Sequence, residues 1–245
     1  MRTSAKKVFN RASTLIVDRE SEFNGHYVYL VKTTYEMGNC DWGNANYSIQ
    51  RMIETARGKG IYRRLLDGLQ LRAIYAYLQG ELTEGMAAAT ELFQLANRHA
   101  NIRFKLFAQF AHAYFSYQQG NIKAALEYAL ELDNQLCQED FTVHDHQLKF
   151  NHLALLAMLY SAHGNESKSM AYAAKAEAHL EGRFKSSFYT LPGYSLLCKV
   201  HLTLWNNCQD LQQAKMYRNK AMNGVKQLKR FSAVFPLGKP AYYLY

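Results

Sequence analysis

Residues 151–180 read NHLALLAMLYSAHGNESKSMAYAAKAEAHL, and this stretch decides the fold of the chain. Leu153, Leu156, Ala157 and Tyr160 recur at the spacing of one face of a helix. The pair Gly164-Asn165 interrupts this pattern, and small residues then follow at helical spacing: Ser169, Ala173 and Ala176. Small side chains let two helices approach closely, so the stretch predicts a helical hairpin.

The same interruption recurs along the chain. It is found at Gly38-Asn39, Gly80-Glu81, Gly120-Asn121 and, with the glycine lost, Gln209-Asp210, at intervals of 42, 40, 44 and 45 residues. Five residues after each break stand the small residues Gly43, Gly85, Ala125, Ser169 and Ala214. Nine residues after it stand Tyr47, Ala89, Ala129, Ala173 and Arg218. A fixed period of this kind predicts a repeat array.

Each break has a physical explanation. Glycine ends a helix in the left-handed conformation, and Asn, Asp or Glu after it suits the start of the next helix. Proline is absent before Pro192, as uninterrupted helices require. We therefore expect an all-α, right-handed superhelix of about five hairpins over residues 1–245, starting with a second helix at 3–17. Helices should end within about three residues of each glycine, with Ala125, Ala129, Ala173 and Ala176 buried.

This pattern resembles the tetratricopeptide repeat family. The matching residues are Leu-x-x-Leu-Ala-x-x-Tyr at 153–160 with Gly164, Ser169, Ala173 and Ala176, and Ala113 with Gly120, Ala125 and Ala129. The spacing of 40 to 45 residues departs from the 34 residues of that family, and its proline between repeats is missing.

A narrower resemblance concerns longer, looser units. Residues 36–45 (EMGNCDWGNA) and 235–244 (FPLGKPAYYL) look like the repeat regions of large signalling proteins, such as soluble adenylyl cyclases and ATPase-linked kinases and regulators. This resemblance implies that cyclase, kinase or ATPase domains lie outside these 245 residues, which would be a fragment of a longer chain.

Charge is concentrated at one end of the chain. Residues 1–182 hold 19 basic and 19 acidic residues, whereas residues 183–245 hold ten basic residues and one acid, Asp210. This gives the chain its formal charge of +9 and predicts attraction to an acidic partner surface or to nucleic acid. The alternative is a solvated helix face. The basic patch expected on this segment consists of Lys215, Arg218, Lys226, Lys229 and Arg230.

Sequence signals for catalysis are missing. No catalytic motif occurs, the four cysteines form no C-x-x-C pair, and we expect no catalytic residue, metal or cofactor. His144, His146 and His152 favour a polar loop over a metal site. Arg57-Gly-Lys-Gly60 favours a helix end over a phosphate site. No apolar stretch is long enough for a membrane span or a secretory signal, which predicts a cytoplasmic protein.

Tyrosine recurs three residues before the breaks. Those positions are Tyr35, Tyr77, Tyr117, Ser161 and Asn206. Tyrosine is enriched in interfaces, so first helices that line a groove would present these rings to a partner. The predicted groove comprises Lys32, Tyr35, Gln70, Tyr77, Phe110, Tyr114 and Tyr117; the alternative for the tyrosines is packing within the core.

The sequence thus predicts a non-catalytic scaffold or regulatory segment in signal transduction. It would bind a protein partner or other domains of its own polypeptide. The second hypothesis is a nucleic-acid-binding helical repeat that uses the basic C-terminal quarter. Nucleic acid is the less expected partner, because readers of one base per repeat need a near-constant repeat length.

Overall fold

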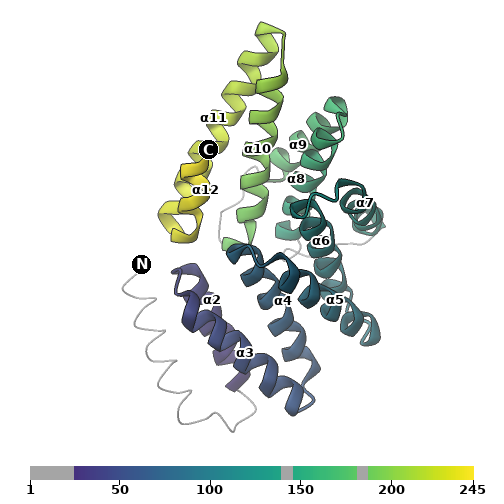
Figure 1. The fold of residues 1–245 in the computed structure, drawn as a ribbon, viewed down its shortest axis with the longest axis vertical. Helices are drawn as coiled ribbons and strands as arrows, with labels where there is room; N and C mark the ends of the chain where they lie inside the picture. The colour runs from purple at the N-terminus through teal and green to yellow at the C-terminus, as the bar shows by residue number, and fades with distance from the viewer. Residues whose placement is uncertain (1–24, 139–145, 181–186) are drawn as a thin grey trace. The chain divides into compact units, whose positions relative to one another are not determined.

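The computed structural model describes residues 25–138, 146–180 and 187–245 (Figure 1). This part of the chain contains eleven α-helices and two short 3₁₀ helices, and no strand. The helix predicted at 3–17 and His144, which was predicted to lie in a loop, are outside the described residues.

Successive helices pack as antiparallel pairs, which confirms the all-α class and the hairpins. Their bounds are α2 Gly25–Gly38, α3 Trp42–Gly58, α4 Tyr62–Gln79, α5 Leu82–Arg98, α6 Ile102–Gln118, α7 Ile122–Gln138, α8 His146–Ala162, α9 Glu166–Leu180, α10 Leu191–Asn207, α11 Leu211–Val234 and α12 Lys239–Leu244. The 3₁₀ helices are η2 Phe188–Thr190 and η3 Pro236–Gly238. Helices end at or within two residues of Gly38, Gly80, Gly120 and Gly164, as predicted.

The chain divides into two compact units, residues 1–105 and 106–245. In the first unit α3 packs against both α2 and α4, and its core holds Ile49, Met52 and Leu92. In the second unit α8 packs against α7, α9 and α10. All residues of α8 from Phe150 to Tyr160 are buried, so this helix is enclosed on every side.

Left-handed residues set the length of the helices. They recur every twenty residues in the first part of the chain, at Cys40, Gly60, Gly80, Ala100 and Gly120, with φ between 51° and 82°. After each of them, the next N–H donates to the carbonyl five residues before it, as Glu81 does to Ala76 and Asn121 to Ser116, at 2.9 Å in both cases. These bonds cap the preceding helix. Among the described residues, the next such turn is at Gly164.

The register predicted for the first hairpin is wrong by two residues. The left-handed residue there is Cys40, not Gly38, and Asp41 makes the bond that Glu81 makes one hairpin later. The closely packed positions are therefore Ala45 and Ile49, both fully buried, whereas Gly43 is exposed and Tyr47 is 54% exposed. Glycine is the residue most suited to the left-handed turn, but Cys40 adopts it here with φ 62°.

Small residues pack between the helices in the middle of the array. Ala125, Ala129 and Ala176 are 0% exposed and Ala173 is 1% exposed, which confirms the prediction. In the last pair Ala214 is half-buried and Arg218 is exposed. There the close approach occurs at Gly224, where a Cβ atom would lie 2.6 Å from the Sγ of Cys198. Every described helix is too short or too polar to cross a bilayer.

Candidate functional site

The residues predicted to line a groove differ in their exposure. Tyr35, Tyr77 and Gln70 are half-buried, whereas Phe110, Tyr114 and Tyr117 are buried. The corrected register also places Met37, not Tyr35, at the position of Tyr77 and Tyr117, so the equivalence assumed for Tyr35 is wrong. Half-buried rings can still contact a partner, and the groove stays a prediction.

Tyr117 is held within the second unit. Its ring is 8% exposed, and the Lys199 ammonium donates to its hydroxyl at 2.8 Å and lies 5.3 Å from its ring centroid. The predicted groove residue Lys32 also has a partner, because its ammonium lies 3.7 Å from the carboxylate of Glu36. The first contact joins α6 to α10, whereas the second lies within α2. Because its ring is buried and its hydroxyl is bonded, Tyr117 has little surface left to contact a ligand.

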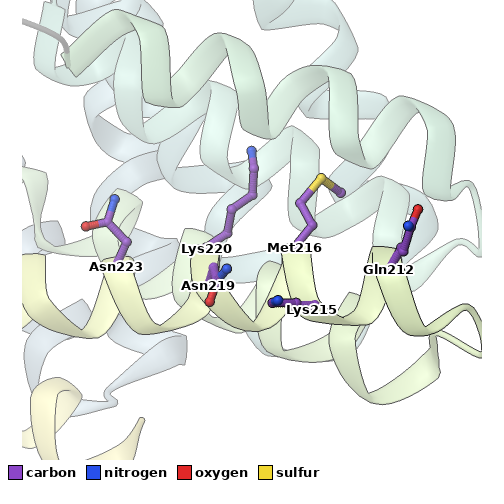
Figure 2. Close-up of a pocket in the computed structure, with 6 residues that line it drawn as sticks. All are labelled: Gln212, Lys215, Met216, Asn219, Lys220 and Asn223. Atoms are coloured by element: carbon purple, nitrogen blue, oxygen red, sulfur yellow. The ribbon is translucent and has the colours of Figure 1, made fainter.

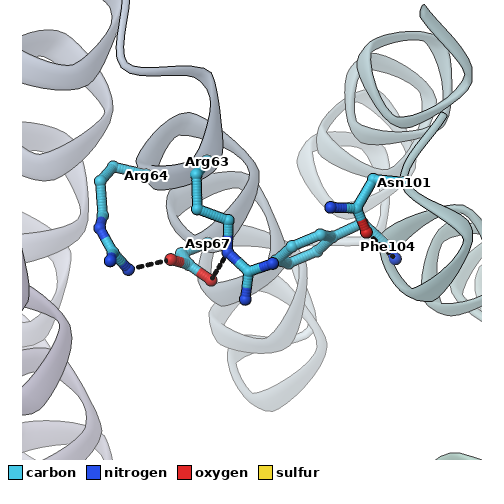
Figure 3. A network of polar contacts seen from close by, with 5 residues as sticks. All are labelled: Arg63, Arg64, Asp67, Asn101 and Phe104. Carbon is cyan, nitrogen blue, oxygen red and sulfur yellow. Dashed lines mark hydrogen bonds and ion pairs between the residues drawn. The ribbon is translucent and has the colours of Figure 1, made fainter. Parts of the chain in front are cut away.

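Two arginines of the first unit pair with one buried acid (Figure 3). Asp67 is buried, and its carboxylate lies 2.6 Å from Arg64 and 3.8 Å from Arg63, whose guanidinium stacks 4.8 Å from the ring of Phe104. Burial raises the pKa of Asp67, and the two arginines oppose this shift. Both ion pairs lie within α4, at the i,i+4 and i,i+3 spacings, and the contact of Arg63 with Phe104 connects this cluster to α6.

The second unit contains two polar bridges that share one geometry. Asp133 on α7 lies 3.1 Å from the Nε2 of His152 on α8 and accepts a hydrogen bond from the hydroxyl of Tyr172 on α9 at 2.9 Å. Glu177 on α9 lies 2.8 Å from the Nε2 of His201 on α10. Its other oxygen accepts a hydrogen bond from Lys220 on α11 at 2.7 Å. Each acid thus joins its own helix to both helices of the next pair.

These bridges are structural. His152 is 0% exposed and His201 is 1% exposed, so a substrate has no access to either imidazole. Burial lowers the pKa of His152, and the hydrogen bond from His152 lowers the pKa of Asp133. The pKa of Glu177 is also lowered, because its bonds to His201 and Lys220 outweigh its burial. A neutral histidine that donates to a carboxylate connects the helices without exposing a reactive group.

Metal and phosphate sites find little support in the geometry. No group of three or more His, Cys, Asp or Glu side chains suited to a metal occurs among the described residues. The Arg57-Gly-Lys-Gly60 segment is a helix end: Gly60 has φ 65°, and the N–H groups of Lys59, Gly60 and Ile61 donate to carbonyls of α3. Those amides are therefore occupied.

The predicted basic patch on α11 is exposed. All five of its residues are exposed, and α11 contains six cations and no acid. Within the described residues, Lys220 is the one cation of α11 that has a carboxylate at ion-pair distance. By contrast, all five arginines of α3 and α4 lie 2.6 to 3.8 Å from a carboxylate oxygen. The positive charge of α11 is thus left to interact outside the described chain.

Two hollows lie along α11. One, of about 460 Å³, is lined by five polar residues and Met216, which project from successive turns of the helix (Figure 2): Gln212, Lys215, Met216, Asn219, Lys220 and Asn223. The other, of about 340 Å³, lies between α10, α11 and α12 and is mainly apolar. Its residues are Leu202, Trp205, Ala221, Met222, Val225, Lys226, Lys229, Tyr242 and Tyr245. Burial raises the pKa of Tyr245 to about 12, so its hydroxyl is neutral.

Sequence reasoning found the cations of this region but missed the apolar hollow. Its residues come from three helices spread over residues 202–245, and no motif links them. A partial signal was present, because large apolar residues such as Met222 and Val225 interrupt the basic run. Comparison with protein-family models found no match, and a search among curated proteins found no similar sequence.

Proposed function

We propose that this chain is a non-catalytic scaffold or regulatory segment of the tetratricopeptide-like, superhelical kind, which binds a protein partner or another domain of its own polypeptide. The observation that carries the proposal is the surface of α11. Five cations there have no carboxylate at ion-pair distance among the described residues, and two of them, Lys226 and Lys229, border an apolar hollow. That hollow also contains Trp205, 39% exposed, and Met222, 47% exposed. Large exposed apolar and aromatic side chains beside charge are typical of interaction surfaces.

The packing of the helices supports this proposal. Paired helices stacked by small residues form a rigid framework, and in repeat proteins such frameworks present extended binding surfaces. Two histidines, His152 and His201, are buried in bridges between helices, where they strengthen the framework. Tyr35, Tyr77 and Gln70 would form a second contact surface in this function.

Photo-cross-linking in the source cells tests the proposal. A photoreactive amino acid is placed at Met222 or at Tyr77, and a control is placed at exposed Lys123 on α7. We expect a small set of nuclease-resistant protein adducts from Met222 or Tyr77 that Lys123 does not give. Identical adducts at all three positions, or none, would contradict a scaffold function.

Nucleic-acid binding is the second candidate function. The observation that favours it is the first hollow along α11, where amides of Gln212, Asn219 and Asn223 lie beside Lys215 and Lys220. Amides and lysines can bind base edges and phosphates. Salt-dependent retention of the purified chain on RNA or DNA, lost when Lys215 and Lys226 are changed to glutamate, would support this candidate over the first.

A further inference from the structure

Resting on the proposed scaffold function, we propose that the α10–α12 surface binds an acidic amphipathic helix, whose apolar side chains enter the hollow beside Trp205 and Met222 while its carboxylates pair with the cations of α11. The partner is thus defined by its chemistry: a helical peptide segment with Asp or Glu on the flanks of an apolar stripe.

Four of the six cations of α11 lie on one face. Lys215, Arg218, Met222, Lys226 and Lys229 follow each other at spacings of three or four residues, which places them in one row along the helix. From Lys215 to Lys229 the row is about 21 Å long at 1.5 Å per residue. A partner helix of about 14 residues has the same length.

Charge complementarity selects an acidic partner. The helices α10, α11 and α12 together contain eight Lys and Arg residues and no Asp or Glu. Lysines three residues apart, such as Lys226 and Lys229, repel each other when no acid lies between them. Carboxylates of a bound helix would relieve that repulsion and would also speed the encounter.

The hollow selects an apolar anchor within that partner. Its volume of about 340 Å³ lies at the small end of the range of ligand pockets, and its walls include the rings of Trp205, Tyr242 and Tyr245. Lys226 and Lys229 stand at this hollow as well as in the basic row. An aromatic or leucine side chain could therefore fill the hollow while acids one turn away contact these two lysines.

Nucleic acid and a second copy of the chain fit this surface less well. Single strands stack their bases on open aromatic faces, but the guanidinium of Arg218 already lies 5.9 Å from the ring centroid of Trp205. Apolar Met222 and Val225 separate the cations, and a sugar-phosphate backbone has nothing apolar to match them. A second copy brings the same excess of positive charge, +9 in total, so two such surfaces repel each other.

The test starts from a phage-displayed library of random 16-residue peptides selected on the whole chain. We expect the selected peptides to be acidic, with aromatic or leucine residues three or four positions apart. A selected peptide is then made synthetically, and its binding is measured by fluorescence anisotropy at low and high salt. A single-stranded RNA of about 20 nucleotides, longer than one single-strand site, serves as the competing probe.

Three variants of the chain give the readout. K226E/K229E and W205A/M222Q should each weaken binding of the peptide at least tenfold, because one removes the charge and the other removes the anchor site. The control R98E/K123E changes the charge by the same amount at exposed positions elsewhere and should bind like the wild type. Trp205 and Met222 are both well exposed, so their replacement leaves the fold intact, which circular dichroism checks.

Several results would overturn the proposal: no selected peptide, neutral or basic selected peptides, wild-type binding by W205A/M222Q, equal weakening in the control, or RNA that binds more tightly and displaces the peptide. A separate result distinguishes failure of this inference from failure of the scaffold function. If peptides avoid α11 while Tyr77 still gives specific protein cross-links, the scaffold stands and the acidic-helix inference falls.

Discussion

His152 on α8 and Asp133 on α7 lie 3.1 Å apart between Nε2 and Oδ1, in a position where the imidazole has no contact with solvent. His201 and Glu177 repeat this relationship one helix pair later, at 2.8 Å. Asp133 and Glu177 each stand 13 residues after a glycine break, at Gly120 and at Gly164. The bridge is therefore a recurrent feature of the second unit.

Replacing Asp133 with Asn should destabilise the second unit. The amide keeps the shape of the side chain but cannot accept hydrogen bonds from His152 and Tyr172 with both of its polar atoms, so one buried donor loses its partner. The expected cost is about 1 to 3 kcal/mol in the free energy of unfolding, measured with urea. Asn134→Ala, at the exposed neighbouring position, should change it by less than about 0.5 kcal/mol. Equal stability of D133N and wild type would show that the bridge is dispensable.

The free energy of unfolding should decrease in two stages as the pH is lowered. Burial lowers the pKa of His152 in the folded state, so the unfolded chain binds a proton first and stability decreases below about pH 6.5. The pKa values of Asp133 and Glu177 are also lowered, so their contribution is present above the unfolded values, about 3.9 and 4.3, and is lost as the pH falls through the folded values.

A matched variant isolates the first stage. Burial raises the pKa values of Glu36 and Asp67, so these two acids make the folded state more stable as the pH falls, opposite to the effect of His152. Both acids are present in the wild type and in His152→Gln, so their effect cancels when the two proteins are compared. The difference in melting temperature between the two should therefore shrink as the pH falls from neutral to about pH 5, where an unburied histidine is protonated. A difference independent of pH would show that His152 does not titrate on unfolding.

Leucine at the small positions should overpack the hairpins. Ala129 and Ala173 are enclosed between helices, and Ala129→Leu or Ala173→Leu should cost roughly 1 to 3 kcal/mol in thermal or urea unfolding. Ala174→Leu is the control, because Ala174 lies on the exposed face of the same helix. Equal melting of A173L and A174L would refute the close packing.

Substitutions at two of the left-handed turns should change the stability of the fold in opposite directions. Gly120 has φ 82° and open space around its Cα, so Gly120→Ala tests the backbone alone and should destabilise the fold by about 1 kcal/mol. Ala100 has φ 51°, so Ala100→Gly should relieve strain and stabilise the fold by a similar or smaller amount. Thermal unfolding of both variants checks the twenty-residue period, which predicts that the two shifts differ in sign.

Neutralising the basic surface should act on the rate of association. Changing Lys226, Lys229 and Arg230 together to Gln removes long-range attraction to an acidic partner, so the association rate should fall and its salt dependence should flatten. Dissociation should change less than it does in W205A/M222Q. Stopped-flow mixing with the selected peptide measures both rates, and an unchanged salt dependence in the triple variant would rule out electrostatic steering by α11.

Much of the helical framework could be predicted from the sequence. Gly80, Gly120 and Gly164 mark helix ends because a positive φ is a local steric property of the backbone. Ala129 and Ala173 mark close packing because their small size at helical spacing is visible in the sequence. The predicted register of the first hairpin is wrong because the prediction relied on glycine to mark each turn. There the left-handed residue is Cys40, and no local rule of sequence points to a cysteine.

The candidate site depended on tertiary structure. The sequence by itself determined that the positive charge lies in the last quarter of the chain and that helices carry it. Only the packing decided that Arg57 pairs with Glu91 and Arg72 with Glu84 on another helix. It also decided that the cations of the basic patch on α11 meet no carboxylate of the described residues, and that Trp205, Met222 and Tyr242 meet at one hollow. The reason is physical: helix formation follows from local backbone preferences and periodicity, whereas ion pairs and hollows depend on distances between side chains that folding brings together from separate helices.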